Sequence, residues 1–243
     1  MNTSYDAFAW FYDRYWAPPF QEWEMPALDR LLFPDLSSGR HILDLCCGTG
    51  HLSQQLISRG YRVTGIDASR EMLRVARSKV PAAEFHNADV TSFALERQMD
   101  AAVCAFDSLN HLTEAERVEL AFRNVHAALK PGGCFVFDVI TGEAYAEKWR
   151  KSACTVEPGH AFFLRGAFDP EERIGITRIT MFRLVDSWHR ADIEVRQRPW
   201  EIPEIRPLLR RAGFSQLDTY RANEDLGMEG HYGIGRVFFR AYK

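Results

Sequence analysis

The sequence predicts an α/β fold: a doubly wound, mostly parallel sheet of seven strands. Between residues 41 and 140, short β-rich runs alternate with helical patterns, which is typical of right-handed βαβ units. The run HILDL at 41–45 leads straight into a glycine turn, and the chain closes with a helix followed by two further strands. Ligands of such sheets bind at the carboxyl ends of the strands.

The apolar runs place the elements in order. The expected strands are 41–45, 62–67, 83–88, 101–106, 134–140, 215–221 and 235–242, and the expected helices are 51–59, 69–79, 114–129 and 203–214. Ser69 and Thr113 precede two of these helices, and both residue types favour the N-cap. The sequence Lys-Pro-Gly-Gly at 130–133 ends the third helix.

Two segments lie outside this core, which we expect to comprise residues 41–141 and 201–243. Residues 1–40 are predicted to form N-terminal lid helices, because nine aromatic residues fall within the first 25 positions and several have helical spacing. Residues 142–200 contain three runs typical of consecutive antiparallel strands, with a turn at 169–172. We expect this insertion to form an antiparallel β cap.

Composition favours a small-molecule partner. The formal net charge of −3 gives no electrostatic reason to expect nucleic acid or an anionic membrane. The chain opens without a basic and apolar leader, so we expect a cytoplasmic, monomeric or homodimeric protein. Five cysteines without a C-x-x-C pair indicate reduced thiols, and no residue group has the spacing of a metal site.

The glycine turn raises the question of which nucleotide it holds. Read as G-x-G-x-x-S from Gly48 to Ser53, with Asp67 after the next strand, it is a weak match to a dinucleotide fingerprint. Asp44 lies inside the preceding strand, close to the turn. A carboxylate there suits a pyrophosphate poorly and a cationic ligand well.

The stretch Asp-Leu-Cys-Cys-Gly-Thr-Gly resembles the first motif of the class I S-adenosylmethionine-dependent methyltransferases, Asp-x-Gly-x-Gly-x-Gly. The matching positions are Asp44, Cys46, Gly48 and Gly50. The resemblance implies S-adenosylmethionine as cofactor, with its sulfonium and amino group near Asp44. Cys46 replaces the first glycine, which we expect to be tolerated if its φ stays negative.

Other positions follow the same resemblance. It implies that Asp67 accepts both ribose hydroxyls and that Ala68 and Met72 lie against the adenine. Taken alone, a carboxylate at the end of a strand is also an ordinary turn former.

Two later loops complete the implied cofactor site. The pair Asp89-Val90 resembles the residues that bind adenine through a side chain and a backbone amide, and Phe106 is expected near the methionine portion.

Two residues are catalytic candidates. Tyr5-Asp6 and Tyr12-Asp13 resemble the Tyr-Asp pairs of the lid helix in family members that act on small molecules, and Tyr12 is the one expected at the active site. His111 follows the fourth strand and is the candidate base. A neutral amine needs no base for methylation, whereas an alcohol usually does.

The sequence therefore predicts methyl transfer to N or O of a small-molecule acceptor. The insertion resembles the three-stranded cap of amino-sugar N-methyltransferases and of uncharacterised bacterial members. A nicotinamide-linked oxidoreductase is the first alternative, disfavoured by Asp44 and the missing third glycine. A protein that binds the cofactor without transferring a methyl group is the second.

Overall fold

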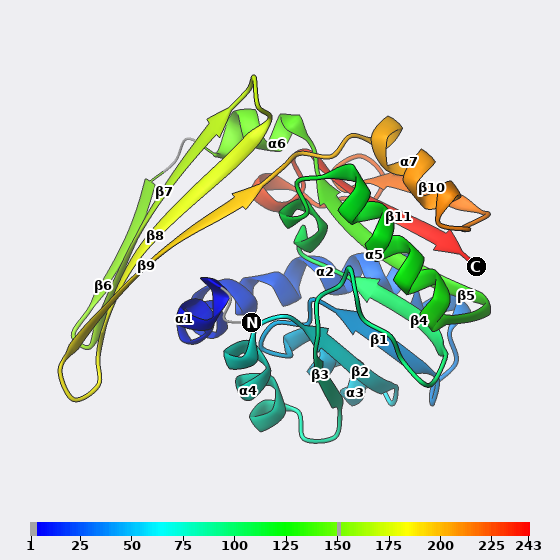
Figure 1. Ribbon diagram of the computed structural model, residues 1–243, viewed down its shortest axis with the longest axis horizontal. Coiled ribbons are helices and arrows are strands. Elements are labelled where there is room, and N and C mark those ends of the chain that lie inside the picture. The colour runs from blue at the N-terminus through cyan, green and yellow to red at the C-terminus, as the bar shows by residue number, and fades with distance from the viewer. Residues whose placement is uncertain (1–3, 150–151) are drawn as a thin grey trace.

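The computed structural model describes residues 4–149 and 152–243, and within them the strands form a seven-stranded and a four-stranded sheet (Figure 1). The larger sheet has the order β10-β11-β5-β4-β1-β2-β3. Its strands are β1 His41–Leu45, β2 Arg62–Asp67, β3 Glu84–Asn87, β4 Met99–Cys104, β5 Leu129–Ile140, β10 Leu217–Arg221 and β11 Arg236–Tyr242. The first five run parallel, and β11 pairs antiparallel with both β5 and β10. The predicted fold class is confirmed.

Helices cover both faces of this sheet, as expected of a doubly wound fold. They are α2 Ala17–Leu31, α3 His51–Ser58, α4 Arg70–Lys79, α5 Ala115–Ala128 and α7 Ile202–Arg211, with short turns η2 Phe33–Asp35, η3 Ser108–His111 and η4 Gly230–Tyr232. The side chains of α5 and α7 pack on one face, and those of α2 and α3 pack on the other.

Burial on both faces explains why the central strands read as continuous apolar runs. Every residue of β1 is buried; Leu43 and Leu45 face α5 and α7, whereas Ile42 faces α2 and α3. The carboxyl ends of β1 and β4 lie side by side, and the chain leaves them toward opposite faces. This divergence is the topological switch point at which such sheets bind ligands.

The N-terminal segment, for which a lid is predicted, lies over that edge. It comprises α1 Ser4–Phe11 and the π-helical turn η1 Tyr12–Trp16, which continues into α2. Figure 1 shows α1 between the core and the long second sheet. Phe8 and Phe11 are buried there against Phe162, Met181 and other apolar residues of the second sheet.

The second sheet has one strand more than the three predicted. Its order is β6-β7-β8-β9, all antiparallel, from β6 Ser152–Glu157, β7 His160–Asp169, β8 Ile174–Leu184 and β9 Trp188–Gln197. The additional strand β6 is an edge strand with mostly exposed residues, so it lacks the apolar alternation that marks a half-buried strand. The helix α6 Gly142–Lys148 was also not predicted.

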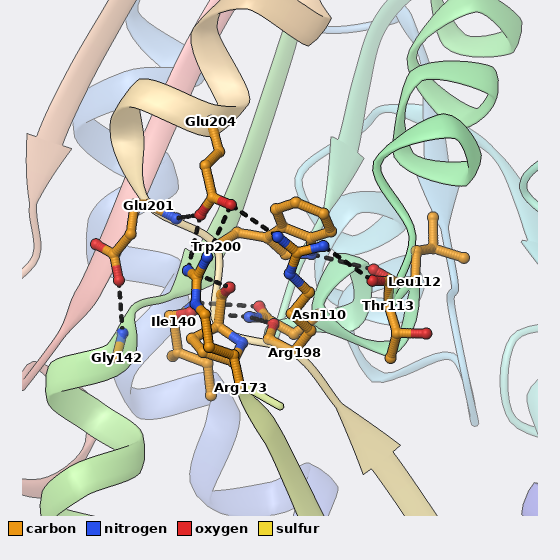
Figure 2. A network of polar contacts seen from close by, with 11 residues as sticks. Asn110, Leu112, Thr113, Ile140, Gly142, Arg173, Arg198, Trp200, Glu201 and Glu204 are labelled. Atoms are coloured by element: carbon orange, nitrogen blue, oxygen red, sulfur yellow. Dashed lines mark hydrogen bonds and ion pairs between the residues drawn. The ribbon is translucent and has the colours of Figure 1, made fainter. Parts of the chain in front are cut away.

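A network of buried polar contacts joins the second sheet to the core (Figure 2). The amide of Asn110 donates to the carbonyls of Ile140 and Arg198 at 2.8 and 2.7 Å, and its oxygen accepts the Ile140 N–H at 3.0 Å. Asn110 thereby ties η3 both to the end of β5 and to the chain leaving β9.

Glu204 on α7 binds the two arginines of this junction, Arg173 and Arg198. Its carboxylate accepts hydrogen bonds from the guanidinium groups of Arg173 and Arg198, all between 2.8 and 3.0 Å (Figure 2). It also accepts the Glu201 N–H as one half of a capping box, which fixes the start of α7.

Three local expectations are settled by the backbone. Ser69 caps α4 as predicted, its hydroxyl accepting the Met72 N–H at 3.2 Å. Thr113 is not a cap, because Glu114 occupies the N-cap of α5. The fourth strand ends at Cys104 rather than 106, since Phe106 and Asp107 have left-handed φ angles of 61° and 48° that no strand accommodates.

Replacing Asn110 with alanine should destabilise the protein by about 3 kcal/mol, because it leaves two carbonyls and one N–H buried without these partners. Urea denaturation followed by circular dichroism measures the effect. Asn124→Ala is the matched control, since it removes a single 3.1 Å bond to the Val90 carbonyl and should cost about 1 kcal/mol. Equal losses in the two variants would contradict the structural role of Asn110.

Candidate functional site

The glycine turn after β1 is built on left-handed backbone. Gly48 and Gly50 have φ angles of 52° and 79°. Cys46 also has a positive φ, 55°, so the expectation that it keeps φ negative is wrong. The turn leaves the strand at Cys46 itself, and a residue with a Cβ pays roughly 1–2 kcal/mol for that conformation.

A carboxylate from the neighbouring strand holds this turn in place. Asp67 at the end of β2 accepts the Gly48 N–H at 2.9 Å with one oxygen and the Ser69 N–H at 2.8 Å with the other. Burial raises the pKa of Asp67, and these two backbone hydrogen bonds oppose the shift. The structure thus brings Asp67 to the turn.

Asp44 lies beneath the turn and faces α3. The hydroxyl of Ser53 donates to its carboxyl at 2.6 Å. Burial raises the pKa of Asp44 to about 7, although the hydrogen bonds from Ser53 favour the ionised form. A positive charge close to this group would restore its ionisation at neutral pH.

The other residues proposed for adenine binding are more dispersed. Asp89 follows β3 and accepts the N–H and hydroxyl of Thr91 at 2.8 and 2.7 Å, which is an Asx turn. Val90 packs into the core beneath α5. Ala68 lies half-buried beside Asp67, and Met72 is buried against the lid residue Phe8.

A buried ion cluster lies next to Phe106. Arg236 on β11 contacts the carboxylate of Asp138 on β5 and donates to Asp107 at 2.9 Å, and its guanidinium lies 5.9 Å from the Phe106 ring. The Asp107 N–H donates to Asp138 at 3.0 Å, and Gln197 from β9 donates to Asp107 at 2.8 Å. Arg236 and Gln197 were not predicted as site residues.

Two buried carboxyl oxygens near this cluster have no hydrogen-bond partner within residues 4–149 and 152–243: Oε2 of Glu24 and Oδ1 of Asp138. Burial, with the charges of Asp138 and Asp44, raises the pKa of Glu24 well above its usual value. Burial also raises the pKa of Asp138, to about 6, against the pull of Arg236. Such oxygens suit the hydrogen-bond donors of a polar ligand.

The lid closes directly on the glycine turn. The Tyr12 ring is so near Gly48 that a Cβ at that position would lie 3.3 Å from Tyr12 Cε1. A cavity of about 30 Å³ remains, lined in part by Tyr12, Asp44, Cys46 and Phe106. A nucleotide is far larger, so the lid must move for one to enter.

Two lid aspartates fasten this closed position. Asp6 accepts the Ser69 hydroxyl at 2.6 Å and the Glu71 N–H at 3.2 Å, at the start of α4. Asp13 forms an ion pair with Lys79 and accepts a hydrogen bond from Nε2 of His51 at 2.9 Å. Both anchors lie on the helices that flank the turn.

The hydroxyl of Tyr5 is 3.1 Å from Nε2 of His111, and the two rings meet edge to face. Burial lowers the pKa of His111, so its ring is neutral at pH 7. A hydrogen bond with the backbone of Arg196 favours the charged form of the ring. This is the effect expected when a ring N–H donates to the Arg196 carbonyl. Nε2 then carries no proton and accepts a hydrogen bond from the Tyr5 hydroxyl.

Tyr5 is the lid tyrosine that contacts His111, whereas the sequence favoured Tyr12 for the active site. Burial raises the pKa of Tyr5, and the nearby charges of Asp107 and Asp67 raise it further, so the group stays a hydroxyl. The repeated Tyr-Asp dipeptide was the available signal. Only the path of the lid shows that its first copy meets His111.

Comparison with known proteins agrees with this geometry. Residues 42–133 match the family described as "Methyltransferase domain". The Bacillus subtilis (strain 168) protein named "Putative methyltransferase YqeM" is 30% identical over 247 residues, covering 98% of this chain and 97% of YqeM. The crystal structure of an S-adenosylmethionine-dependent methyltransferase from Clostridium acetobutylicum ATCC 824 superposes with a TM-score of 0.79 at 21% identity, covering 99% of each chain.

The chain belongs to the class I S-adenosylmethionine-dependent methyltransferases. It is an enzyme of that family, and S-adenosylmethionine is its cofactor rather than a nicotinamide nucleotide. A further relative is the dTDP-3-amino-3,6-dideoxy-alpha-D-glucopyranose N,N-dimethyltransferase of Streptomyces fradiae, 32% identical over 115 residues, or 47% of this chain and 44% of that protein.

Two other kinds of feature are absent from the described residues. Within the described residues, no group of three or more His, Cys, Asp or Glu side chains is placed to hold a metal ion. None of the helices described here is long and apolar enough to cross a membrane.

The raised pKa of Asp44 predicts how stability depends on pH. Below pH 7 the folded protein holds a proton that the unfolded chain has already lost, so Asp44 makes the cofactor-free protein less stable as pH rises from about 4 to about 7. Asp44→Asn removes this titration. Relative to wild type, its free energy of unfolding should therefore increase by about 3 kcal/mol between pH 5 and pH 8.

Urea denaturation of both proteins at the two pH values measures this change. Asp100→Asn is the control: burial raises the pKa of Asp100, but hydrogen bonds from Lys130, His41 and Arg40 outweigh it and lower the pKa to about 2. Asp100 is ionised in both states throughout the window, so its variant should show a constant difference. A constant difference for Asp44→Asn would mean that Asp44 titrates normally.

Proposed function

We propose that this enzyme transfers the methyl group to the amine nitrogen of a small hydroxylated molecule, such as an amino sugar, bound beneath α1. The observation that carries the location of the site is the Tyr5–His111 pair, in which a neutral imidazole is buried under the lid. Such a base serves an alcohol, and it equally serves an amine that arrives protonated. The relative from Streptomyces fradiae, named as an amino-sugar N,N-dimethyltransferase, supports the same acceptor class.

The cofactor supplies an electrophilic methyl group on a sulfonium sulfur. The protein must align the acceptor, exclude water and receive a proton. Amines are protonated in neutral solution, so the acceptor must lose a proton before its lone pair can attack. His111 is neutral, and its Nε2 can take that proton once the acceptor replaces the Tyr5 hydroxyl beside it. Tyr5 and Tyr12 close the site over it.

The carboxyl groups beneath the lid suit an acceptor that carries hydrogen-bond donors. Glu24 and Asp138 each present a buried oxygen that no described residue satisfies. The hydroxyl or amino groups of a sugar are donors of this kind. The cap, residues 142–200, is proposed to complete the acceptor pocket, since Gln197 reaches the ion cluster and Arg196 fixes His111.

The cofactor itself is proposed to occupy the edge formed by β1, β2 and β4. Asp44 would face its positive charge, and Asp67 would accept the ribose hydroxyls, exchanging its bonds to Gly48 and Ser69 in part for the ligand. The remaining proposed contacts are Cys46, Gly48, Gly50, Ala68, Met72, Asp89, Val90 and Phe106.

Asp67→Ala tests the proposed cofactor contact. It should weaken S-adenosylhomocysteine binding by roughly 2–4 kcal/mol, because a carboxylate that accepts two hydroxyls is lost. Titration calorimetry measures the affinity, and circular dichroism checks that the glycine turn still folds. Asp218→Ala is the control and should bind as wild type does, because Asp218 lies on the distant strand β10 in a half-buried ion pair with Arg240 of β11. Unchanged affinity of Asp67→Ala would remove this residue from the site.

His111→Gln tests the proposed base. Glutamine keeps a hydrogen-bonding side chain but takes no proton, so kcat with an amine acceptor should fall about 100- to 1,000-fold while the Kd of S-adenosylmethionine changes little. The assay follows S-adenosylhomocysteine release with sugars that carry an amino group or a hydroxyl at one otherwise identical position. Methylation of the hydroxyl form alone would overturn the amine assignment.

The control for this experiment is His189→Gln, an exposed histidine at the far turn of the cap sheet that pairs with Asp186. It should retain wild-type kcat. The pH profile of kcat separates proton transfer from positioning. The kcat of the wild type should decrease at pH values below the lowered pKa of His111, and this decrease should be absent in His111→Gln. A shared profile would make His111 a positioning residue.

A further inference from the structure

Two thiols meet beneath the glycine turn. Cys104 ends β4, and in the parallel pairing of β1 with β4 it lies opposite Leu45. Cys46 is the next residue of the chain after Leu45, and its side chain packs against the core cluster that contains Cys104. Neighbouring positions on paired strands fall within the Cα separations of about 4.4–6.8 Å that disulfides span.

The left-handed backbone at Cys46 creates this meeting. Side chains alternate along a strand, so a regular continuation of β1 would direct Cys46 to the face opposite Leu45 and Cys104. With φ at 55°, Cys46 instead packs against the same core cluster as these two residues. Its conformation therefore places the two sulfurs side by side.

The two sulfurs differ in access. Cys46 is half-buried and lines the small cavity under Tyr12, whereas Cys104 is fully buried. Burial and the contact with Cys46 keep Cys104 a thiol, since both raise its pKa. An oxidant that enters the cofactor site therefore meets Cys46 first, with a second thiol directly behind it.

The other cysteines lie elsewhere. Cys47 faces Phe85 on the opposite side of the turn, Cys134 is buried beside Tyr242, and Cys154 is exposed on β6.

We propose that Cys46 and Cys104 form a reversible disulfide when a peroxide oxidises the cofactor-free enzyme, and that this disulfide weakens cofactor binding. The turn from Cys46 to Gly50 carries the backbone that Asp67 holds in place. Drawing the two sulfurs to the bond length of about 2.05 Å pulls the first residue of the turn toward β4. The cofactor site and the thiol pair thus share one piece of backbone.

The chemistry balances with peroxide as oxidant. The Cys46 sulfur attacks one peroxide oxygen, the O–O bond breaks, and water leaves, giving a sulfenic acid. The Cys104 sulfur then attacks the Cys46 sulfur, the S–O bond breaks, and the departing hydroxide takes the Cys104 proton as a second water. Two thiols and one peroxide yield one disulfide and two waters.

Linkage gives the proposal a second signature. If the disulfide lowers the affinity for S-adenosylhomocysteine tenfold, saturating ligand must favour the reduced form by the same factor. For a two-electron couple, that factor corresponds to a rise of about 30 mV in the reduction potential of the pair.

The test treats wild type, Cys104→Ala and Cys154→Ser with hydrogen peroxide and maps peptides by mass spectrometry without reduction. Wild type and Cys154→Ser should show the 46–104 cross-link and at least tenfold weaker S-adenosylhomocysteine binding by calorimetry, both reversed by dithiothreitol. Cys104→Ala should show neither. Glutathione buffers with and without S-adenosylhomocysteine then measure the shift in potential.

Three outcomes would overturn the proposal: no cross-link in wild type, a cross-link without loss of affinity, or equal loss of affinity in Cys104→Ala. The inference rests on the cofactor site, and the two can be told apart. Failure of the reduced wild type to bind S-adenosylhomocysteine would refute the site itself, whereas normal binding before and after cross-linking would refute the thiol switch alone.

Discussion

The site depends first on a buried cation and the two aspartates that surround it. Isolated charges are costly inside a protein, so Arg236 must be met by carboxylates with suitable geometry, and it finds them in Asp138 and Asp107. Arg236 begins β11, whereas Asp138 and Asp107 lie near the ends of β5 and β4, so the cluster ties the amino end of β11 to the carboxyl ends of β5 and β4. The left-handed turn at Phe106 and Asp107 follows from the same contacts.

The lid is a second layer built on that edge. Its aromatic residues are buried only because the cap sheet covers one side of α1 and the core covers the other. Its aspartates add direction: Asp6 bonds at the start of α4, where the helix dipole favours an anion, and Asp13 pairs with Lys79 at the end of the same helix. Apolar burial holds the lid down, and the two carboxylates set its register.

Much of the fold was predictable because the parallel strands are buried on both faces and read as continuous apolar runs. Ser69, a residue type that favours the N-cap, likewise predicted the start of α4. The strand β6 gave no such signal, since its residues are mostly exposed and do not alternate. The sign of φ at Cys46 was also out of reach, because it depends on where the turn leaves the sheet.

The site followed the same division. Asp44, Asp67 and the glycines are close in sequence or end adjacent strands, and the structure brings them together. Arg236 and Asp138 are 98 positions apart, and no local pattern joins them. Tyr5 and Tyr12 each begin a copy of the same Tyr-Asp dipeptide, so only the tertiary path of the lid distinguishes them. Asp89 and Met72, which were predicted to contact the adenine, have other partners in the structure. Asp89 accepts a hydrogen bond from Thr91, and Met72 packs with Phe8.

The contact of Tyr12 with Gly48 has a kinetic consequence. While that ring covers the turn, a nucleotide can neither enter nor leave, so each exchange must break the ion pair and the hydrogen bond of Asp13 and lift aromatic surface out of the cap sheet. Unlatching is therefore a slow, cooperative event compared with the motion of a loop. With the cofactor at the proposed site, departure of the demethylated product would require the same unlatching.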